Sequence, residues 1–521
     1  MDKNRRHFLK GAAASAATAM LGTACTGSSS HPDAGGANPT AEHRVLIIGS
    51  GFGGGISALR LAQAGISSTI LERGRRWEAY PNAETFPHAG KPDKRVLWYT
   101  AAKNSATPYA GLLEPVASST MTVMCACGVG GGSLVYQGMT LQPPEALFKK
   151  CFPAGIDYAE MDQVFYPRVA SMLHVATAPD ELVNSPSYLA SRVFKRNAER
   201  VGYTVDKIPM PIDWSYALRE LNGEMNPSYT NGDCALGVNN GGKYSVDVTY
   251  IAAAEATGLV TVETLHNVTG VARTANGLWQ VFVDVTDETG KILESKVMTT
   301  KALIMAAGSV NTTKLLVRAA AQGKIPNMPA ALGTGWGTNA DRIYIWNDKE
   351  DDFGAAQGGP VIYGSKEWGN PDLANTVIQA SVPPMGFDTH STMLVGFGIS
   401  AARGSWNYDS ITQEVHLDWK REGDSVIQKR ISERVQAIAG PTSKLIDTNA
   451  ILPSTWHPLG GACMETVCDL EGRVHNQPGL YVLDGALIPG ATAACNPSMT
   501  IAAIVERALD RIVKNDLGTL I

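Results

Sequence analysis

The segment 43–74, HRVLIIGSGFGGGISALRLAQAGISSTILERG, constrains the fold more than any other part of the chain. Its apolar run at 45–48 is continuous, as in strands that are buried on both faces of a parallel sheet. The glycine loop GSGFGG follows and matches the pattern G-x-G-x-x-G, and the apolar residues after it have helical spacing. A second strand is predicted at 69–71 and ends at Glu72, 23 residues after Gly49. Strand, glycine loop, helix, strand and acid in this order predict a dinucleotide-binding βαβ unit.

The glycines of this loop have separate tasks in such a unit. Gly49 permits the tight turn, Gly51 lets the backbone approach a pyrophosphate, and Gly54 allows the helix to pack on the strand. The pyrophosphate then lies at the positive end of the helix dipole. Glu72 stands where an acid binds a ribose hydroxyl pair, which argues against NADP, although the motif alone leaves NAD and FAD open.

Three later segments predict further points of close backbone approach. The stretch 127–135, CGVGGGSLV, is a second glycine-rich loop, in which backbone can pack against a flat ring. Apolar strands are predicted at 301–309 and 479–485, and each runs into a glycine. A helix is predicted to follow Asn496, which suits an N-cap, and its positive end would stabilise an anionic reduced flavin.

Together these stretches resemble the glucose–methanol–choline family of flavoprotein oxidoreductases, and within it the bacterial cholesterol oxidases that hold FAD without a covalent bond. The resemblance runs over nearly all of 45–512 and includes GVGGGSLV, YPRVASML, TLHNVTGV, AAGSVNTTKLLV, WHPLGG and GLYVLDGALIPG. It implies an α/β FAD-binding (Rossmann-like) domain with an inserted α+β substrate domain built on an antiparallel sheet. Alternating runs at 280–285 and 415–419 fit strands of such a fold.

The resemblance also implies how the chain is divided between the two domains. The FAD-binding domain is expected at 43–80, 120–175, 255–315 and 455–521. The substrate-binding domain is expected at 81–119, 176–254 and 316–454.

Position by position, the resemblance implies a set of FAD contacts. They are Phe52, Gly53, Glu72, Gly132, Met139, Val268, Gly485 and Ser498. Tyr136 and Gln137 depart from the family, which has asparagine and glycine there beside the flavin; a tyrosine at this place can alter the redox potential or the oxygen path. No histidine lies beside the loop 128–132, so a histidyl-linked flavin is not expected there, whereas a covalent link elsewhere stays open.

The resemblance implies the chemistry of STWHPLGGACM, residues 454–464. His457 and Asn496 would position a substrate hydroxyl beside the flavin, since a neutral imidazole can accept its proton near neutral pH. The implied reaction oxidises a 3β-hydroxysteroid to the ketone, with hydride transfer to flavin and reduction of O2 to H2O2. Loops over an apolar pocket would open at a membrane surface to admit the sterol, with 383–386 as a candidate hinge.

One expected residue is replaced. Where the family has the glutamate that carries the proton in double-bond isomerisation, our alignment places Gln379, and a shift of two residues places Ser381. An amide cannot carry a proton, so isomerisation is in doubt whereas alcohol oxidation is less affected. Asp388 and His390 are nearby alternatives.

Composition and the N-terminus set the cellular context. The 521 residues are 44% hydrophobic and 18% charged with a net charge of -5, which gives no basic surface for nucleic acid. Residues 1–25 resemble a twin-arginine signal, with the pair at 5–6 and a short apolar run, and 26–42 predict a flexible spacer. The mature protein is therefore expected to be secreted or periplasmic, and Cys25 offers a lipid anchor as an alternative. The eight cysteines show no metal-site spacing.

Two other functions fit the same residues. One is a flavin alcohol dehydrogenase of this family that passes electrons to a quinone or cytochrome instead of O2. The other is a flavin- and lipid-binding protein without turnover, prompted by the missing glutamate and by Tyr136, against which the intact His457 and Asn496 argue.

Overall fold

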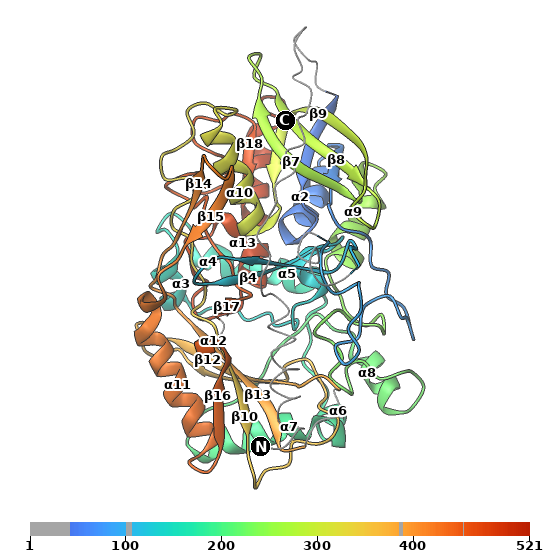
Figure 1. The fold of residues 1–521 in the computed structure, drawn as a ribbon, viewed down its shortest axis with the longest axis vertical. Coiled ribbons are helices and arrows are strands. Elements are labelled where there is room, and N and C mark those ends of the chain that lie inside the picture. Colours follow the sequence, from blue (N-terminus) through green and yellow to red (C-terminus); the bar gives the residue numbers. More distant parts are fainter. Residues whose placement is uncertain (1–41, 100–106, 385–388, 452) are drawn as a thin grey trace.

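The computed structural model describes residues 42–99, 107–384, 389–451 and 453–521. The expected signal at 1–25 and nearly all of the expected spacer lie outside these residues, as does Asp388. Two large sheets organise the chain, one in the upper and one in the lower half of Figure 1. No helix of the described residues is long and apolar enough to cross a membrane.

The upper sheet has the order β6-β2-β1-β9-β8-β7, with β18 also paired to β9. Five of its strands are parallel: β1 (His43–Ile48), β2 (Ser68–Leu71), β6 (Val260–Glu263), β9 (Ile292–Met305) and β18 (Leu480–Val482). Two are antiparallel: β7 (His266–Arg273) and β8 (Trp279–Thr286). The predicted strands at 45–48 and 69–71 are confirmed. Apart from Thr69, which is partly exposed, their residues are fully buried or nearly so, as expected for a sheet covered on both faces.

Three long helices accompany this sheet: α2 (Phe52–Gln63), α10 (Gly308–Ala321) and α13 (Pro497–Asp516). A buried ion pair joins α2 to α13, because Arg60 donates to both carboxylate oxygens of Glu506, at 2.6 and 2.7 Å. Glu506 is fully buried and also accepts hydrogen bonds from Tyr250 and Arg168, at 2.9 and 3.3 Å. The carboxylate therefore ties together helices that are more than 400 residues apart in the chain.

The lower sheet is antiparallel and has the order β16-β10-β13-β12-β11-β5. Its strands are β5 (Asp206–Lys207), β10 (Arg342–Asn347), β11 (Tyr363–Glu367), β12 (Asn375–Ala380), β13 (Ser391–Gly398) and β16 (Lys444–Asp447). Helices α7 (Leu189–Arg200) and α11 (Ser425–Ala439) lie against it. Gly396 and Gly398 let α11 come close, since a Cβ at either position would clash with Ile431 or Ile427. The face of the sheet that carries these glycines is therefore the helix-covered one.

The remaining strands form two small sheets. β14 (Ser405–Asp409) and β15 (Glu414–Asp418) make a hairpin, and β3 (Leu113–Ala117), β4 (Thr122–Ala126) and β17 (Ser454–Thr455) make a three-stranded sheet. The alternating runs at 280–285 and 415–419 are strands, as predicted, and lie in β8 and at β15. Both are paired in antiparallel ladders, β8 with β7 and β9, and β15 with β14.

Candidate active site

The carboxyl ends of β1, β9 and β18 meet at one edge of the upper sheet. Gly49 has a φ of +96°, and a Cβ there would clash with the backbone of Ala306 at the end of β9. A Cβ at Gly53 would clash with Leu483 at the end of β18. Only glycine fits at these two positions, so the predicted motif serves the packing of three strand ends as well as a ligand.

The second glycine loop lies directly on the first. The 3-10 turn η1 (Gly131–Leu134) approaches so closely that a Cβ at Gly131 would be 2.8 Å from Cα of Gly51. The N–H of Gly130 donates to the Ser50 carbonyl at 3.2 Å. Two loops that are 80 residues apart in sequence thus form one cradle of backbone.

This cradle fits the FAD that the resemblance implies. The start of α2 has no side-chain cap and no acid in its first turn, so its N–H groups are available to a pyrophosphate. Gly132 is exposed, and a Cβ there would meet no atom within 4 Å. The hydroxyl of Tyr136 is buried and has no hydrogen-bond partner among the described residues. A buried hydroxyl normally has a partner, and a bound ligand could provide it.

Tyr136 is tied to this cradle from two sides. Its ring packs edge-to-face on Phe52, with 5.8 Å between the ring centroids. Lys243 lies 4.9 Å from the same ring and donates to the carbonyls of Leu134 and Tyr136, at 2.9 and 2.7 Å. Burial lowers the pKa of Lys243 to about 8 and raises that of Tyr136. Sequence reasoning missed Lys243, because no motif marked it.

Glu72 joins the two glycine loops. Its carboxylate accepts from the N–H and hydroxyl of Ser50 at 3.2 and 2.6 Å, from the N–H of Gly74 at 2.8 Å, and from that of Gly128 at 3.1 Å. Four donors match the capacity of a carboxylate. A ribose bond at Glu72 remains a prediction, and it would have to share these oxygens with Ser50.

The other predicted FAD residues lie on three further elements. Val268 lies on β7, whose first residue donates its N–H to the Glu72 carbonyl at 3.0 Å. Gly485 begins the turn η6 (Gly485–Leu487), and its Cα is so close to the carbonyl of Pro458 that a Cβ would lie 3.3 Å from it. The Ser498 hydroxyl donates to the Met139 carbonyl at 3.1 Å.

His457 follows β17 and is held by an aspartate. Its Nδ1 lies 2.7 Å from Oδ1 of Asp341, and its ring packs edge-to-face on Phe397 at 5.6 Å. Asp341 is buried, and burial acts to raise its pKa. The His457 ring and hydrogen bonds from Thr455 and Trp456 outweigh burial and hold the pKa below its ordinary value. Sequence reasoning missed Asp341, which precedes His457 by 116 residues with no spacing rule to join them.

Asn496 occupies the N-cap position of α13, as predicted. Its side chain does not make the capping hydrogen bond that was expected of it. Its side chain turns to the segment 139–141 instead. The amide oxygen accepts from the N–H of Leu141 at 3.2 Å, and the amide nitrogen donates to the Met139 carbonyl and to Ser498, the latter at 2.8 Å. The amide of Asn496 cannot bond both the segment 139–141 and the first N–H groups of α13 with the same atoms. In this structure it bonds the segment 139–141.

A single segment, 337–341, brings the surroundings of His457 and Asn496 together. Gly337 exchanges backbone hydrogen bonds with Leu459, at 2.8 and 3.0 Å. The Asn339 amide donates to the hydroxyl of Thr492 and to the carbonyl of Cys495, both at 2.8 Å. The segment 337–341, which ends in Asp341 just before β10, therefore bonds the chain beside His457 and also the chain beside Asn496.

Gln379 is not brought to this site, which corrects its assignment as a catalytic candidate. In the pairing of β12 with β13, Thr376 is opposite Phe397 and Gln379 is opposite Leu394. Successive strand residues point to opposite faces, so Gln379 faces α7 and α11 while Phe397 faces His457. Its amide is satisfied there by Ser191 at 3.0 Å and Thr392 at 3.1 Å.

The nearby alternatives to Gln379 are also occupied or remote. Ser381 directly follows β12 and donates its hydroxyl to the Gly358 carbonyl. His390 is exposed, and its Nδ1 is bonded to the Asp351 carbonyl at 2.9 Å.

The face of the lower sheet that carries Phe397 is largely apolar and partly exposed. By the strand register its apolar residues are Ile343, Ile345, Ile378, Ala380, Met393, Val395 and Phe397, and Thr376 lies opposite Phe397. Ile343, Met393 and Val395 are only partly buried, whereas Thr392, Leu394 and Gly396 between them are buried under helices. Among these described positions there is no acidic side chain.

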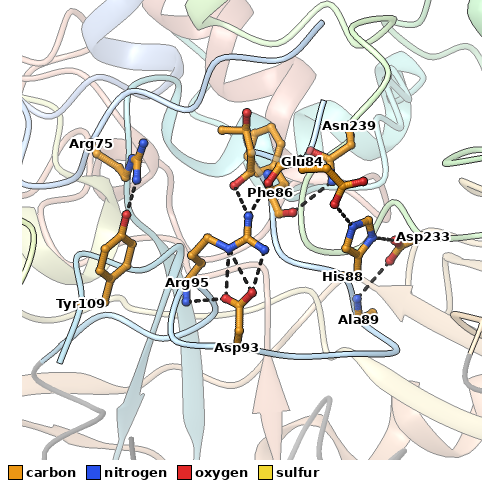
Figure 2. A network of polar contacts seen from close by, with 11 residues as sticks. Arg75, Glu84, Phe86, His88, Ala89, Asp93, Arg95, Tyr109, Asp233 and Asn239 are labelled. Carbon is orange, nitrogen blue, oxygen red and sulfur yellow. Dashed lines mark hydrogen bonds and ion pairs between the residues drawn. The ribbon is translucent and has the colours of Figure 1, made fainter. Parts of the chain in front are cut away.

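A polar network fastens the loop 84–95 at the border of this region (Figure 2). His88 bonds Asp233 on one side and Glu84 on the other, the latter at 2.7 Å, and both bonds raise the pKa of His88. Close by, Gly90 approaches the Pro384 carbonyl, 2.6 Å from where a Cβ would lie. The loop thus meets the chain just before 385–388, residues that the structure does not describe.

Comparison with known proteins agrees with this architecture. Sequence signatures described as GMC oxidoreductase match residues 105–333 and 408–504, and a twin-arginine translocation signal matches 4–22. A cholesterol oxidase of Mycobacterium tuberculosis is 27% identical over 90% of both chains. One of Acinetobacter baumannii is 25% identical over 90% of this chain and 94% of its own.

Solved structures give the same fold. Pyridoxine 4-oxidase from Mesorbium loti matches with a TM-score of 0.62, over 90% of this chain and 99% of its own, at 14% identity. A fungal aryl-alcohol oxidase matches with 0.63, over 91% and 99%, also at 14% identity. The chain belongs to the GMC oxidoreductase family and is an FAD-dependent oxidoreductase that acts on alcohols.

Proposed function

We propose that the protein oxidises a sterol-like secondary alcohol to the ketone and reduces O2 to H2O2, without moving the double bond. The observation that carries this proposal is the placement of His457. Its Nδ1 is engaged by Asp341, and its ring lies against Phe397 on a largely apolar, partly exposed sheet face. A base beside an apolar wall suits a large apolar substrate with a single hydroxyl.

The chain's own residues divide the work. Gly49, Gly51 and Gly53 with the η1 loop would hold FAD, which would supply the hydride acceptor for oxidation of the carbinol carbon. Nε2 of His457 accepts the hydroxyl proton, since Nδ1 is taken. Asn496 keeps 139–141 against the start of α13, because its amide oxygen accepts from Leu141 and its amide nitrogen donates to the Met139 carbonyl and to Ser498.

The substrate class is supported from two sides. The wall residues Ile343, Met393 and Val395 offer apolar contact. The relatives from Mycobacterium tuberculosis and Acinetobacter baumannii are cholesterol oxidases that match over about nine-tenths of this chain. A sterol presents one hydroxyl on a rigid apolar body, which fits a single base beside such a wall.

The missing acid supports the second part of the proposal. Isomerisation needs a group that takes a proton from one carbon and returns it to another. Gln379 faces the helices, and the described wall positions carry no acid. Asp341 is bonded to His457 and Thr455 and is not free to carry a proton.

The test is to mix the FAD-loaded protein with cholesterol in air and to follow both peroxide and the position of the product double bond. Peroxide with the double bond in its original place supports the whole proposal. Peroxide with the conjugated enone rejects oxidation without isomerisation. Flavin that bleaches under nitrogen without peroxide in air indicates a dehydrogenase that uses another acceptor. If several sterols leave the flavin oxidised, the sterol assignment is wrong.

A further inference from the structure

We infer that Asp341 is a positioning residue that fixes the tautomer of His457 and so decides which ring nitrogen accepts the substrate proton. The inference rests on the proposed role of His457 as the base. It concerns a residue that no motif marks, and it predicts a property of the ring that is measurable without any substrate.

The carboxylate of Asp341 is itself fixed. Its Oδ2 accepts from the Thr455 hydroxyl at 2.7 Å and from the N–H of Trp456 at 3.3 Å. Its Oδ1 is then directed at Nδ1 of His457, at 2.7 Å. The backbone carbonyl of Asp341 accepts from Asn449 at 3.1 Å, so the main chain is held as well.

A carboxylate that already receives two donors offers only lone pairs to the ring. Nδ1 must therefore carry the hydrogen, and Nε2 keeps the lone pair. The ring plane is set by Phe397 and by the backbone, since the N–H of His457 donates to the Thr455 hydroxyl oxygen at 3.0 Å. Among the described residues none bonds Nε2, which leaves it for a ligand.

The charged surroundings of the ring are simple. On the described elements around it, Asp341 is the charged group paired with His457, while β13 contributes Phe397 and the segment at the end of β17 contributes Thr455 and Trp456. When His457 takes a proton, Asp341 stabilises the imidazolium at a distance of one hydrogen bond. The carboxylate thus acts on orientation and on charge while it never touches the reacting atoms.

The variant Asp341→Asn reverses this arrangement. Thr455 and Trp456 both donate to the Oδ2 position, so the amide must place its oxygen there and turn its NH2 group to His457. Nδ1 then becomes an acceptor and the hydrogen moves to Nε2, which can no longer take the substrate proton. In the Ser-His-Asp triad the corresponding change lowers kcat by about 10⁴-fold through the wrong tautomer.

The experiment uses the FAD-loaded protein with 15N-labelled histidine and identifies the His457 signals by their loss in His457→Asn. We expect the wild type to show a protonated Nδ1 and an unprotonated Nε2, and Asp341→Asn to show the reverse. We also expect flavin reduction by cholesterol under nitrogen to slow by about 10³-fold or more in Asp341→Asn. Asp424→Asn is the matched control, because Asp424 is a buried carboxylate bonded to 400–402 outside the site.

The outcomes separate the two proposals. A wild-type ring with its hydrogen on Nε2 overturns the inference, even if Asp341→Asn does not fold. So does an Asp341→Asn protein that keeps the wild-type tautomer or reduces its flavin as fast as Asp424→Asn. A wild-type ring with its hydrogen on Nδ1, in a protein whose flavin no alcohol reduces, leaves the inference about Asp341 in place and rejects the proposed function.

Discussion

Gln379 and Phe397 lie on neighbouring strands of one sheet and face opposite sides of it. Phe397 contacts the ring of His457, whereas Gln379 is 1% exposed beneath the helices and bonds Ser191 and Thr392. We therefore expect Gln379→Glu to leave the product double bond unmoved. Because the new carboxylate would be buried against a neutral network, the free energy of unfolding should fall by about 1–3 kcal/mol.

Gln322→Glu, at an exposed helix end, is the control for the added charge and should change stability by less than about 0.5 kcal/mol. Product analysis and urea unfolding measure the two effects. A conjugated enone from Gln379→Glu would show that this residue reaches the substrate after all.

His457→Asn tests the proposed base. Loss of the group that accepts the proton should slow flavin reduction by about 10²–10⁴-fold, while FAD stays bound, since the cradle of Gly51 and Gly131 is untouched. His416→Asn, an exposed histidine on β15, should react at the wild-type rate. Stopped-flow bleaching under nitrogen is the measurement, and equal rates for both variants remove His457 from the chemistry.

Tyr136→Phe and Tyr250→Phe should affect different properties: the first FAD retention, the second the free energy of unfolding. The Tyr136 hydroxyl has no described protein partner, so its loss should leave unfolding of the FAD-free protein unchanged and weaken FAD retention by about 2–10-fold, the value of one hydrogen bond. Tyr250 donates to buried Glu506, so its loss should cost about 1 kcal/mol of stability with unchanged FAD retention. FAD release on dilution and urea unfolding distinguish the two patterns, and identical behaviour contradicts the prediction.

Glu506→Gln should be among the more damaging conservative changes. It removes the charge that Arg60 and Arg168 share between helices, so the free energy of unfolding should fall by about 3 kcal/mol. Asp510→Asn removes the exposed partner of the same Arg168 and should cost under about 1 kcal/mol. Urea midpoints of the two variants provide the test, and similar losses would mean that burial of Glu506 is unimportant.

The raised pKa of Asp484 should make the free energy of unfolding depend on pH. Burial raises its pKa from 3.8 to about 6, although it accepts from Thr312, Gly308 and Ala486. A raised carboxyl pKa favours the folded state below pH 3.8, and this contribution is lost as pH rises through 6. Two pKa units at 1.36 kcal/mol each give about 3 kcal/mol.

The comparison is between the wild type and Asp484→Asn, each unfolded by urea at pH 4 and pH 7.5. The wild type should lose up to about 3 kcal/mol relative to the variant over this range. A constant difference between the two proteins would place the pKa of Asp484 near its ordinary value.

The sequence alone determined the βαβ unit, because its signals are local. Strand, glycine loop, helix and strand at 43–71 each follow from residues a few positions apart, and the structure has them as β1, α2 and β2. The family resemblance, the FAD and the alcohol chemistry followed from short motifs such as WHPLGG, since a motif keeps its meaning wherever the chain places it.

Only the tertiary structure decided which residues meet. Asp341 and His457 are 116 residues apart. Their pairing depends on where the lower sheet places the start of β10, since Asp341 directly precedes that strand. The face to which Gln379 points depends on strand register, in which a shift of one residue exchanges the two faces. Asn496 looked like a helix cap, yet 139–141 competes for the same amide. Local patterns fix elements, whereas long-range packing chooses among the partners that each side chain can bond.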